Sequence, residues 1–287
     1  ALRGRYPPAS SIKPAIAMYG IEEGLIDWNF SIFDEGFFIL PEDGRIYRDW
    51  KEGGHGDTNL FKAITQSSNT YFFDLAYRSD INQLNKHLSS LGFGNKACID
   101  CFEEDQVFVP EPSWKINKHN FGWFKGDTVN MGVGQGYLVS TPIQLAKYAY
   151  IMANKGKFSD LSLKKDLVKS EKSIEFNKFS NDDWFKLHES MVNVIEGNTG
   201  TARRLREKKN YIVAAKTGTA ELVSGDNREQ YSETRLDDSL RDHALIIAFG
   251  PMPNPRYAVS VVVENGESGG SVAGPVAISV LNSLIQE

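Results

Sequence analysis

Residues 6–14 read YPPASSIKP, and the interpretation of the whole chain starts from this stretch. Apolar residues with helical spacing continue from it to about residue 23, with Pro14 in the first turn, where a missing N–H group costs least. Ser10 and Lys13 are three positions apart, so their side chains share one face of the helix start. The amine can then accept the hydroxyl proton, and the free N–H groups of the helix start stabilise developing negative charge.

A Ser-x-x-Lys pattern is not specific by itself. Ser10 can equally be a helix cap, and a second copy, SLKK at residues 162–165, is best explained by a cap followed by solvated charge. Lys13 acts as a base only if it is partly neutral, which requires desolvation or a nearby cation. Lys216 is the residue expected to supply that cation.

Two further motifs follow in the chain. SSN at residues 67–69 offers a second hydroxyl for proton relay and a carboxamide for a substrate amide, with a polar turn as the alternative. KTGT at residues 216–219 closes the alternating run YIVAAKTGT and occurs once. Its lysine and hydroxyls suit a substrate carboxylate, and its glycine lets another backbone approach closely. The three motifs together favour nucleophilic catalysis over a helix cap.

Composition narrows the class of protein. The chain has 287 residues, of which 41% are hydrophobic and 24% charged, which excludes disorder, collagen-like repeats and small disulfide scaffolds. A formal charge of -5 provides no overall basic field, so no nucleic-acid partner is expected. No apolar window is long enough for a membrane span, and no internal repeat indicates a solenoid. The start at Ala1, without Met, is typical of a piece of a longer protein.

The order of the predicted elements indicates an α+β domain, because helices come first, then strands, then a closing helix. Residues 24–56 are rich in Gly, Asp and aromatic residues and are expected to be loop. The other predicted elements are helices at 10–23, 59–77, 81–91, 141–153, 182–195 and 272–285, and antiparallel strands at 211–220, 243–249 and 257–264.

Taken in order, the three motifs resemble those of the penicillin-recognising serine transferases and hydrolases. The resemblance is closer to class B penicillin-binding proteins. It is carried by YPPASSIKP, by GDTVNMGVGQGYLVSTPIQLA at residues 126–146, and by AAKTGTAE, HALIIAFGPMP and NGESGGSVAGPVA, which together cover nearly the whole chain. The Tyr-Pro-Pro start and the residues GDTVNM favour the elongation-specific subgroup, penicillin-binding protein 2, over the division-specific one.

This resemblance implies a D,D-transpeptidase that cross-links peptidoglycan stem peptides and is acylated by β-lactams. Ser10 would attack the carbonyl of the penultimate D-Ala, Lys13 would take its proton, and the backbone N–H groups of Ser10 and Thr219 would form the oxyanion hole. The remaining implied roles are proton relay to the leaving D-Ala by Ser67 and Lys216, orientation of the donor peptide by Asn69, and binding of its carboxylate by Thr217, Gly218 and Thr219.

The family also implies a fold. This is the penicillin-binding, serine β-lactamase-like transpeptidase fold, an antiparallel sheet flanked by helices, here as one N-terminally truncated domain over residues 1–287. Class B proteins have two sheet strands before the nucleophile segment, and the chain begins too late to contain them. We therefore expect three main strands, with the strand at 257–264 at an unpaired edge of the sheet.

Asp34, Asp49 and His55 form a metal hypothesis, because oxygen and nitrogen ligands of this kind can hold zinc. The elongation-type resemblance implies a structural zinc whose fourth ligand is a Cys within Ser-x-Asn, where this chain has Ser68. The alternative is ordinary surface carboxylates and a loop histidine. No organic cofactor is expected.

The resemblance further implies partners and a location. Through the parent protein these are a membrane glycosyltransferase and elongation-complex proteins, at the periplasmic face of the cytoplasmic membrane, with this fragment soluble. Two alternatives stay open: a carboxypeptidase or β-lactamase of the same fold, and a penicillin-sensing receptor domain. Cys98 and Cys101 are expected to form a local disulfide or to be two free thiols. His188 and His243 are interpreted as structural.

Overall fold

The central strand of the main sheet is buried on both faces. The computed structural model describes residues 1–165, 167, 170–222 and 238–285. In it β8 (His243–Gly250) pairs antiparallel with β7 (Ala214–Ala220) and with β9 (Tyr257–Val263). Alternate residues of β8 enter two different hydrophobic clusters, as the period-2 geometry of a strand requires. One cluster includes the C-terminal helix α10 (Gly274–Ile285), and the other includes helices from the first half of the chain.

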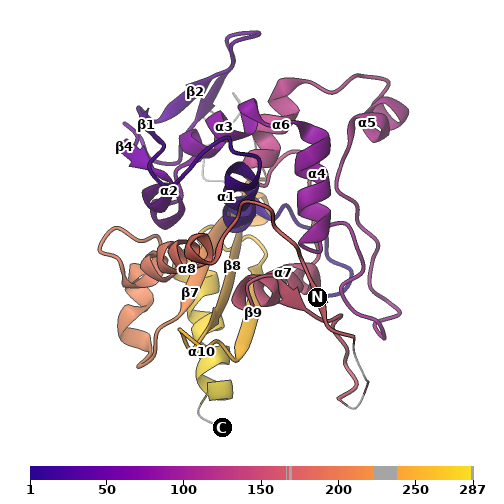
Figure 1. Ribbon diagram of the computed structural model, residues 1–287, viewed down its shortest axis with the longest axis vertical. Coiled ribbons are helices and arrows are strands. Elements are labelled where there is room, and N and C mark those ends of the chain that lie inside the picture. Colours follow the sequence, from indigo (N-terminus) through magenta and orange to yellow (C-terminus); the bar gives the residue numbers. More distant parts are fainter. Residues whose placement is uncertain (166, 168–169, 223–237, 286–287) are drawn as a thin grey trace.

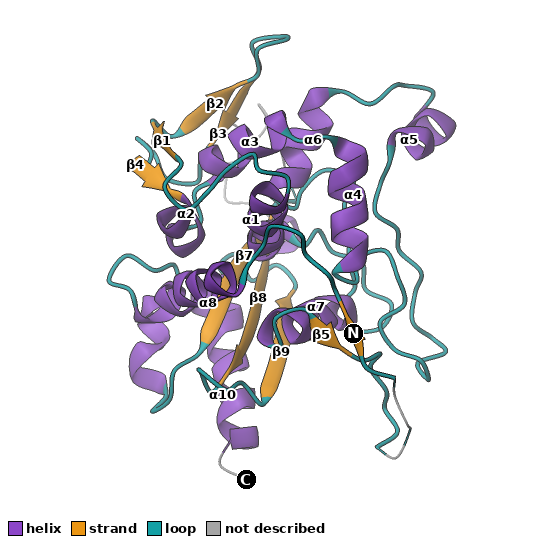
Figure 2. Ribbon diagram, viewed as in Figure 1, coloured by secondary structure: helices purple, strands orange, loops and turns teal. Residues whose placement is uncertain are grey.

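Helices and short strand pairs surround this sheet (Figure 2). In chain order they are η1 (Ala9–Ile12), α1 (Lys13–Glu22), β1 (Ser31–Asp34), β2 (Phe37–Ile39), β3 (Ile46–Arg48), β4 (Gly56–Asn59), α2 (Leu60–Gln66), α3 (Asn69–Arg78), α4 (Ile81–Ser90), α5 (Pro112–His119), α6 (Lys125–Gly132), α7 (Pro142–Ala153), β5 (Lys157–Phe158), β6 (Lys172–Ser173), α8 (Asn181–Glu196), η2 (Arg203–Lys208), η3 (Asp238–Leu240) and the π-helical turn η4 (Gly269–Ala273).

Helix α1 lies between two parts of the molecule (Figure 1). The sheet, α10, α7 and α8 make up the lower part of the view, and β1 to β4 with α2 to α6 make up the upper part. The turn η1 contacts β7, while α1 contacts α3 and α4. The start of α1 is therefore where the KTGT strand and the SSN turn can meet.

The predicted fold class is confirmed: helices flank an antiparallel sheet whose strand order is β7-β8-β9. Within the described ranges β9 pairs with β8 alone, which confirms the expected edge strand. The predicted helix at 141–153 is also confirmed with its cap. Thr141 Oγ1 accepts the Gln144 N–H at 3.3 Å, and Pro142 occupies the first turn.

The single helix predicted at 59–77 is wrong, because the chain forms α2 and α3 with a break between them. Ser67 has φ 61° and ψ 38°, a left-handed conformation that ends α2. The Ser68 hydroxyl then accepts the Tyr71 N–H at 3.2 Å and caps α3. Polar residues in a helical pattern concealed this break, because nothing in the pattern marks a left-handed serine.

The loop predicted at residues 24–56 is also wrong, because it contains β1, β2, β3 and the first residue of β4. These strands have three or four residues, and most of their side chains are exposed or half-buried. They pair as β1 with β4 and β2 with β3. Strands so short carry too little alternation to be recognised, and their pairing depends on contacts made elsewhere in the fold.

Cys98 and Cys101 form a disulfide, one of the two expected states. Among the described residues, the helices are too short or too polar to cross a bilayer.

Candidate active site

A strained turn precedes the serine of the first motif. Ala9 has φ 49°, and its N–H donates to Gly134 O at 2.8 Å. A Cβ on Gly134 would lie 2.2 Å from Ala9 O, so only glycine allows this contact. Ser10 follows in η1, half-buried, and Lys13 begins α1. The GVGQGY block therefore supports the turn that presents Ser10.

The hydroxyl of Ser67 lies between two buried ammonium groups. Lys216 Nζ donates to Ser67 Oγ at 2.7 Å, and Lys13 Nζ lies 3.3 Å from the same oxygen. Both lysine side chains have no exposed surface. The three motifs, far apart in the sequence, thus converge on one oxygen, and a proton can pass between the two amines through it.

The pKa of Lys13 is shifted toward neutral pH. Burial lowers its pKa to about 7, although the charges of Asp49 and Asp34 raise it. Its ammonium donates to Ser67 O at 2.8 Å and to Asn69 Oδ1 at 2.7 Å, which fix its position. A lysine with this pKa is neutral often enough at pH 7 to accept a proton.

Of the two expected causes, desolvation is the main one for Lys13, while the charges of Asp49 and Asp34 act in the opposite direction. Because the repulsion between two ammonium groups is mutual, Lys13 and Lys216 each disfavour the charged form of the other. Burial first, and the charge of Lys13 second, hold the pKa of Lys216 well below its usual range.

Gly218 lies against η1, the turn that carries Ser10. A Cβ at this position would come within 3.3 Å of Pro8 O and Ser11 N, so the absence of a side chain lets β7 approach η1. Thr217 Oγ1 is 2.7 Å from Thr201 Oγ1, and Thr219 O accepts the Gln135 side-chain amide at 3.2 Å. These contacts give the KTGT strand a polar edge beside the serine.

Sequence reasoning missed three residues of the site: Thr201, Gln135 and Trp50. Thr201 belongs to the polar, glycine-rich run GNTGT at residues 197–201, which is itself a turn signal. Gln135 lies within the GVGQGY block. Trp50 Nε1 donates to Ser67 O at 3.1 Å, and no local pattern in the sequence indicates that contact.

The three residues of the metal hypothesis also converge. One ligand atom from each of Asp34, Asp49 and His55 lies within 4.8 Å of the others, and the three side chains are buried. Surface exposure, the alternative interpretation, is therefore wrong. His55 Nε2 is buried without a hydrogen-bond partner among the described residues and is 3.4 Å from Asp49 Oδ1. Ser68 Oγ donates to Asp34 Oδ2 at 2.7 Å.

Asp49 also holds the SSN turn. Its Oδ2 accepts the N–H groups of Asn69, at 2.5 Å, and Thr70, at 2.9 Å, at the start of α3. A carboxylate is stabilised there because several N–H groups point at it. Burial by itself would raise the pKa of Asp49, but the adjacent His55 ring, the charge of Lys13 and the backbone N–H group of Thr70 lower it well below its usual range.

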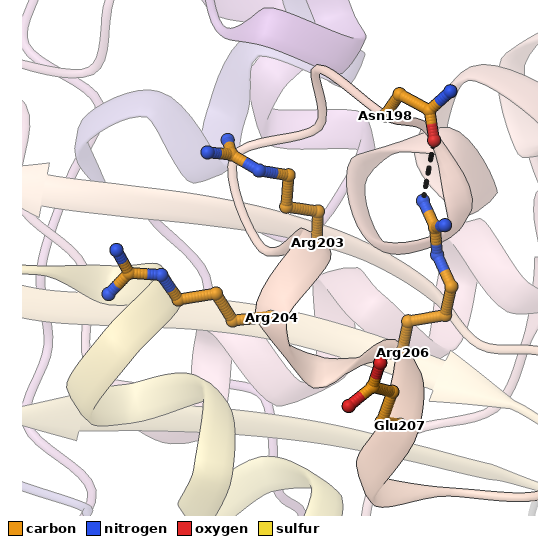
Figure 3. Close-up of a pocket in the computed structure, with 5 residues that line it drawn as sticks. All are labelled: Asn198, Arg203, Arg204, Arg206 and Glu207. Carbon is orange, nitrogen blue, oxygen red and sulfur yellow. Dashed lines mark hydrogen bonds between the residues drawn. The ribbon is translucent and has the colours of Figure 1, made fainter.

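A separate cavity of about 370 Å³ lies beside η2 (Figure 3). Arg206 donates to Glu196 O and to Asn198 Oδ1 on one side of it. Its lining residues, none of which belongs to the catalytic cluster, are Asn198, Arg203, Arg204, Arg206 and Glu207.

The other candidate residues have structural surroundings. His188 Nε2 lies 2.8 Å from Met152 O, and burial lowers its pKa. His243 Nδ1 accepts the Asn265 N–H at 3.0 Å. Ser162, in the second Ser-x-x-Lys copy, donates to Asp100 in a loop.

An α+β fold that brings a serine at a helix start, a Ser-x-Asn turn and a Lys-Thr-Gly strand around two buried lysines defines the penicillin-recognising serine class. Comparison with known proteins agrees. Residues 1–282 match the family described as penicillin binding protein transpeptidase domain, and the chain belongs to this family.

The similar curated proteins include two named peptidoglycan D,D-transpeptidase MrdA. The one from Haemophilus influenzae is 37% identical over 295 residues, covering 100% of this chain and 45% of that protein. The one from Acinetobacter baumannii is 39% identical over 282 residues, covering 95% of this chain and 41% of that protein. This chain thus spans about half the length of the curated relatives it matches.

Solved structures give the same result. Pseudomonas aeruginosa PBP2 in complex with WCK 5153 superposes with a TM-score of 0.88 at 36% identity, covering 100% of this chain and 62% of that one. The complex of PBP2 and MreC from Helicobacter pylori superposes with a TM-score of 0.86 at 31% sequence identity, covering 98% of this chain and 50% of that one. The predicted resemblance to penicillin-binding protein 2 is confirmed by these matches.

Proposed function

We propose that the described residues form one transpeptidase domain, which cross-links peptidoglycan stem peptides through an acyl-enzyme at Ser10. The observation that carries this proposal is the position of Ser67 Oγ, 2.7 Å from Lys216 Nζ and 3.3 Å from Lys13 Nζ. Two buried amines joined through a hydroxyl can take a proton from one oxygen and deliver it to a leaving amine.

In the acylation step Ser10 Oγ attacks the carbonyl carbon of the penultimate D-Ala of the donor peptide, and Lys13 Nζ accepts the hydroxyl proton. The backbone N–H groups of Ser10 and Thr219 stabilise the oxyanion, each contributing about 3 kcal/mol. Collapse of the intermediate breaks the peptide bond. The leaving D-Ala nitrogen receives a proton from Lys216 through Ser67.

Substrate orientation is assigned to the polar groups around this centre. The Asn69 carboxamide orients the donor peptide, and the hydroxyls of Thr217 and Thr219 bind its terminal carboxylate beside Gly218. The proton on Lys13 then passes through Ser67 to Lys216, which leaves Lys13 neutral. An amine of a second stem peptide attacks the ester carbon and gives a proton to Lys13, which returns it to Ser10 as the ester bond breaks. A β-lactam follows the acylation step only, because its cleaved ring stays attached and the ester persists.

Mass spectrometry of the intact protein after penicillin treatment tests this assignment. We expect one adduct of one penicillin mass on the wild-type chain and none on Ser10→Ala. Ser11→Ala is the matched control, because the neighbouring Ser11 hydroxyl is buried and donates to Pro8 O at 2.6 Å, so it is not free to attack a substrate. An adduct that survives in Ser10→Ala would remove Ser10 from its role.

The lifetime of the adduct separates the alternatives. A β-lactamase releases penicillin quickly, whereas a transpeptidase and a penicillin receptor retain it. Formation of a new amide when a D-amino acid is added with a thioester donor distinguishes a transpeptidase from a receptor. A carboxypeptidase would release the hydrolysed donor instead.

We also propose that Asp34, Asp49 and His55 hold a structural divalent cation, zinc by the chemistry of this donor set. The unpartnered His55 Nε2, facing Asp49 Oδ1, is the observation that favours it. His55 Nδ1 lies 3.0 Å from Gln66 Oε1, which suits a ring that donates there and offers Nε2 as a ligand. Ser68 offers a hydroxyl as the fourth group.

A cation at this position has only a structural role, and no proton transfer passes through it. Elemental analysis after dialysis at neutral pH is expected to give one zinc per chain, lost in His55→Ala. A metal content well below one per chain in the wild type would overturn this assignment. The transfer chemistry itself requires no organic cofactor.

Partners and location follow from the relatives. A similar solved structure is a complex of PBP2 with MreC, and we propose that the parent protein works with elongation-complex proteins of that kind and with a membrane glycosyltransferase. Its substrates lie outside the cytoplasmic membrane, so we place this domain at the periplasmic face. Co-purification of the full-length parent from membranes tests the association.

A further inference from the structure

Trp50 is an exposed aromatic residue whose polar atom points into the catalytic cluster. Its side chain is 59% exposed, so the ring is not part of the hydrophobic core. Its Nε1–H donates to Ser67 O at 3.1 Å, and its ring meets His55 edge-on with 5.5 Å between centroids. Core packing does not explain the position of this tryptophan.

The carbonyl that Trp50 contacts belongs to the strained residue of the site. Ser67 has φ 61°, a left-handed conformation that is strained for a non-glycine residue. This conformation directs both Ser67 O and Ser67 Oγ toward Lys13 Nζ, at 2.8 and 3.3 Å. A rotation of the peptide between Ser67 and Ser68 would therefore disturb both contacts of the base.

Two consecutive residues, Asp49 and Trp50, hold the chain at this turn and directly after it. The Asp49 carboxylate accepts N–H groups from Asn69 and Thr70, after the turn. The Trp50 indole donates to Ser67 O, at the turn itself. A carbonyl oxygen has two lone pairs, and here Lys13 Nζ and Trp50 Nε1 use both. Together the two donors fix the direction of the carbonyl.

We propose that Trp50 is a positioning residue for acyl transfer: its indole N–H holds the Ser67 carbonyl so that Lys13 and Ser67 Oγ keep their working geometry. It acts through Ser67 and needs no contact with substrate. The proposal rests on the proposed function, because it gives Trp50 a part in the acylation step assigned above.

Trp50→Phe tests the proposal, because it keeps an aromatic ring beside His55 and removes the N–H donor. Stopped-flow acylation by a fluorescent penicillin separates the affinity of the initial complex from the rate constant of the chemical step. We expect that rate constant to fall about tenfold, with unchanged affinity and an unchanged melting temperature. Trp123→Phe is the matched control, since Trp123 Nε1 donates to Thr128 Oγ1 at 2.8 Å and to none of the residues assigned a part in acylation.

A second measurement uses the wild-type chain and does not depend on acylation. We expect the indole N–H of Trp50 to exchange with solvent much more slowly than a free indole, although its ring is exposed. Unchanged acylation in Trp50→Phe would overturn the positioning role, and so would fast exchange of this proton. A wild type that forms no adduct would instead refute the proposed function, and the exchange rate would still decide whether the contact exists.

Discussion

The pH dependence of acylation follows from the burial of Lys13. Because the base must be neutral to accept the Ser10 proton, the acylation rate should follow the neutral fraction of Lys13, whose pKa is lowered to about 7. At pH 7 roughly half of such a base is neutral, whereas a lysine with its usual pKa would be neutral in roughly one molecule in 3,000. Burial thus makes the base about a thousand times more available.

The assay is the second-order rate constant for acylation by penicillin between pH 5 and pH 9, with circular dichroism at each pH as the folding control. We expect a rate about 50-fold lower at pH 5 than at pH 7, and a plateau above pH 8. A profile flat from pH 6 to pH 9, or one that still rises steeply between pH 8 and pH 9, would refute the assignment of Lys13 as the base.

The same pKa predicts a stability effect of known sign. A buried amine with a lowered pKa binds fewer protons in the folded chain than in the unfolded chain, so stability rises with pH between about 7 and 10.5. From pH 7.5 to pH 9 Lys13 alone contributes about 2 kcal/mol to this rise in the free energy of unfolding. Urea denaturation at both pH values measures it, and Lys13→Met should show a smaller rise.

Three other outcomes are expected. Gly134→Ala places a methyl group 2.2 Å from Ala9 O and should lower the free energy of unfolding by about 2 kcal/mol, visible in urea denaturation; an unchanged midpoint would contradict the described turn. Thr201→Val removes the partner of Thr217 Oγ1 and should weaken the initial penicillin complex about fivefold in saturation kinetics, with equal affinity refuting the link. Reduction of the disulfide in residues 98–101 should leave acylation unchanged, because that short loop lies outside the site; a loss of rate would show coupling.

Much of the site could be predicted from sequence because its parts are local motifs. The spacing of Ser10 and Lys13 on a helix start, and the strand that contains Lys216, follow from backbone periodicity alone. The order of the three motifs then indicated the family, and the fold with it. The helix broken at Ser67 was not predictable, because a left-handed serine is stabilised by contacts from Lys13 and Trp50 rather than by its neighbours in the chain.

The electrostatics of the site were harder to predict from the sequence than its motifs. Desolvation or a nearby lysine charge was expected to lower the pKa of Lys13; burial is the main cause, and the charge of Asp49 raises this pKa. Burial and long-range charges depend on which distant segments pack together, and no local pattern reports them. For the same reason the sequence could not show that Asp34, Asp49 and His55 converge, since all three lie in a stretch predicted to be loop.

The amino-acid sequence by itself determined the class of chemistry, several of the helix starts and the strands of the main sheet. Each of these depends on side-chain type and on spacing along the backbone. The tertiary structure alone decided which amine is tuned, how Ser67 is turned and which residues hold it there. Those properties arise where segments from opposite ends of the chain exclude water from a shared centre, and the free energy of a charge or hydrogen bond is set by that exclusion.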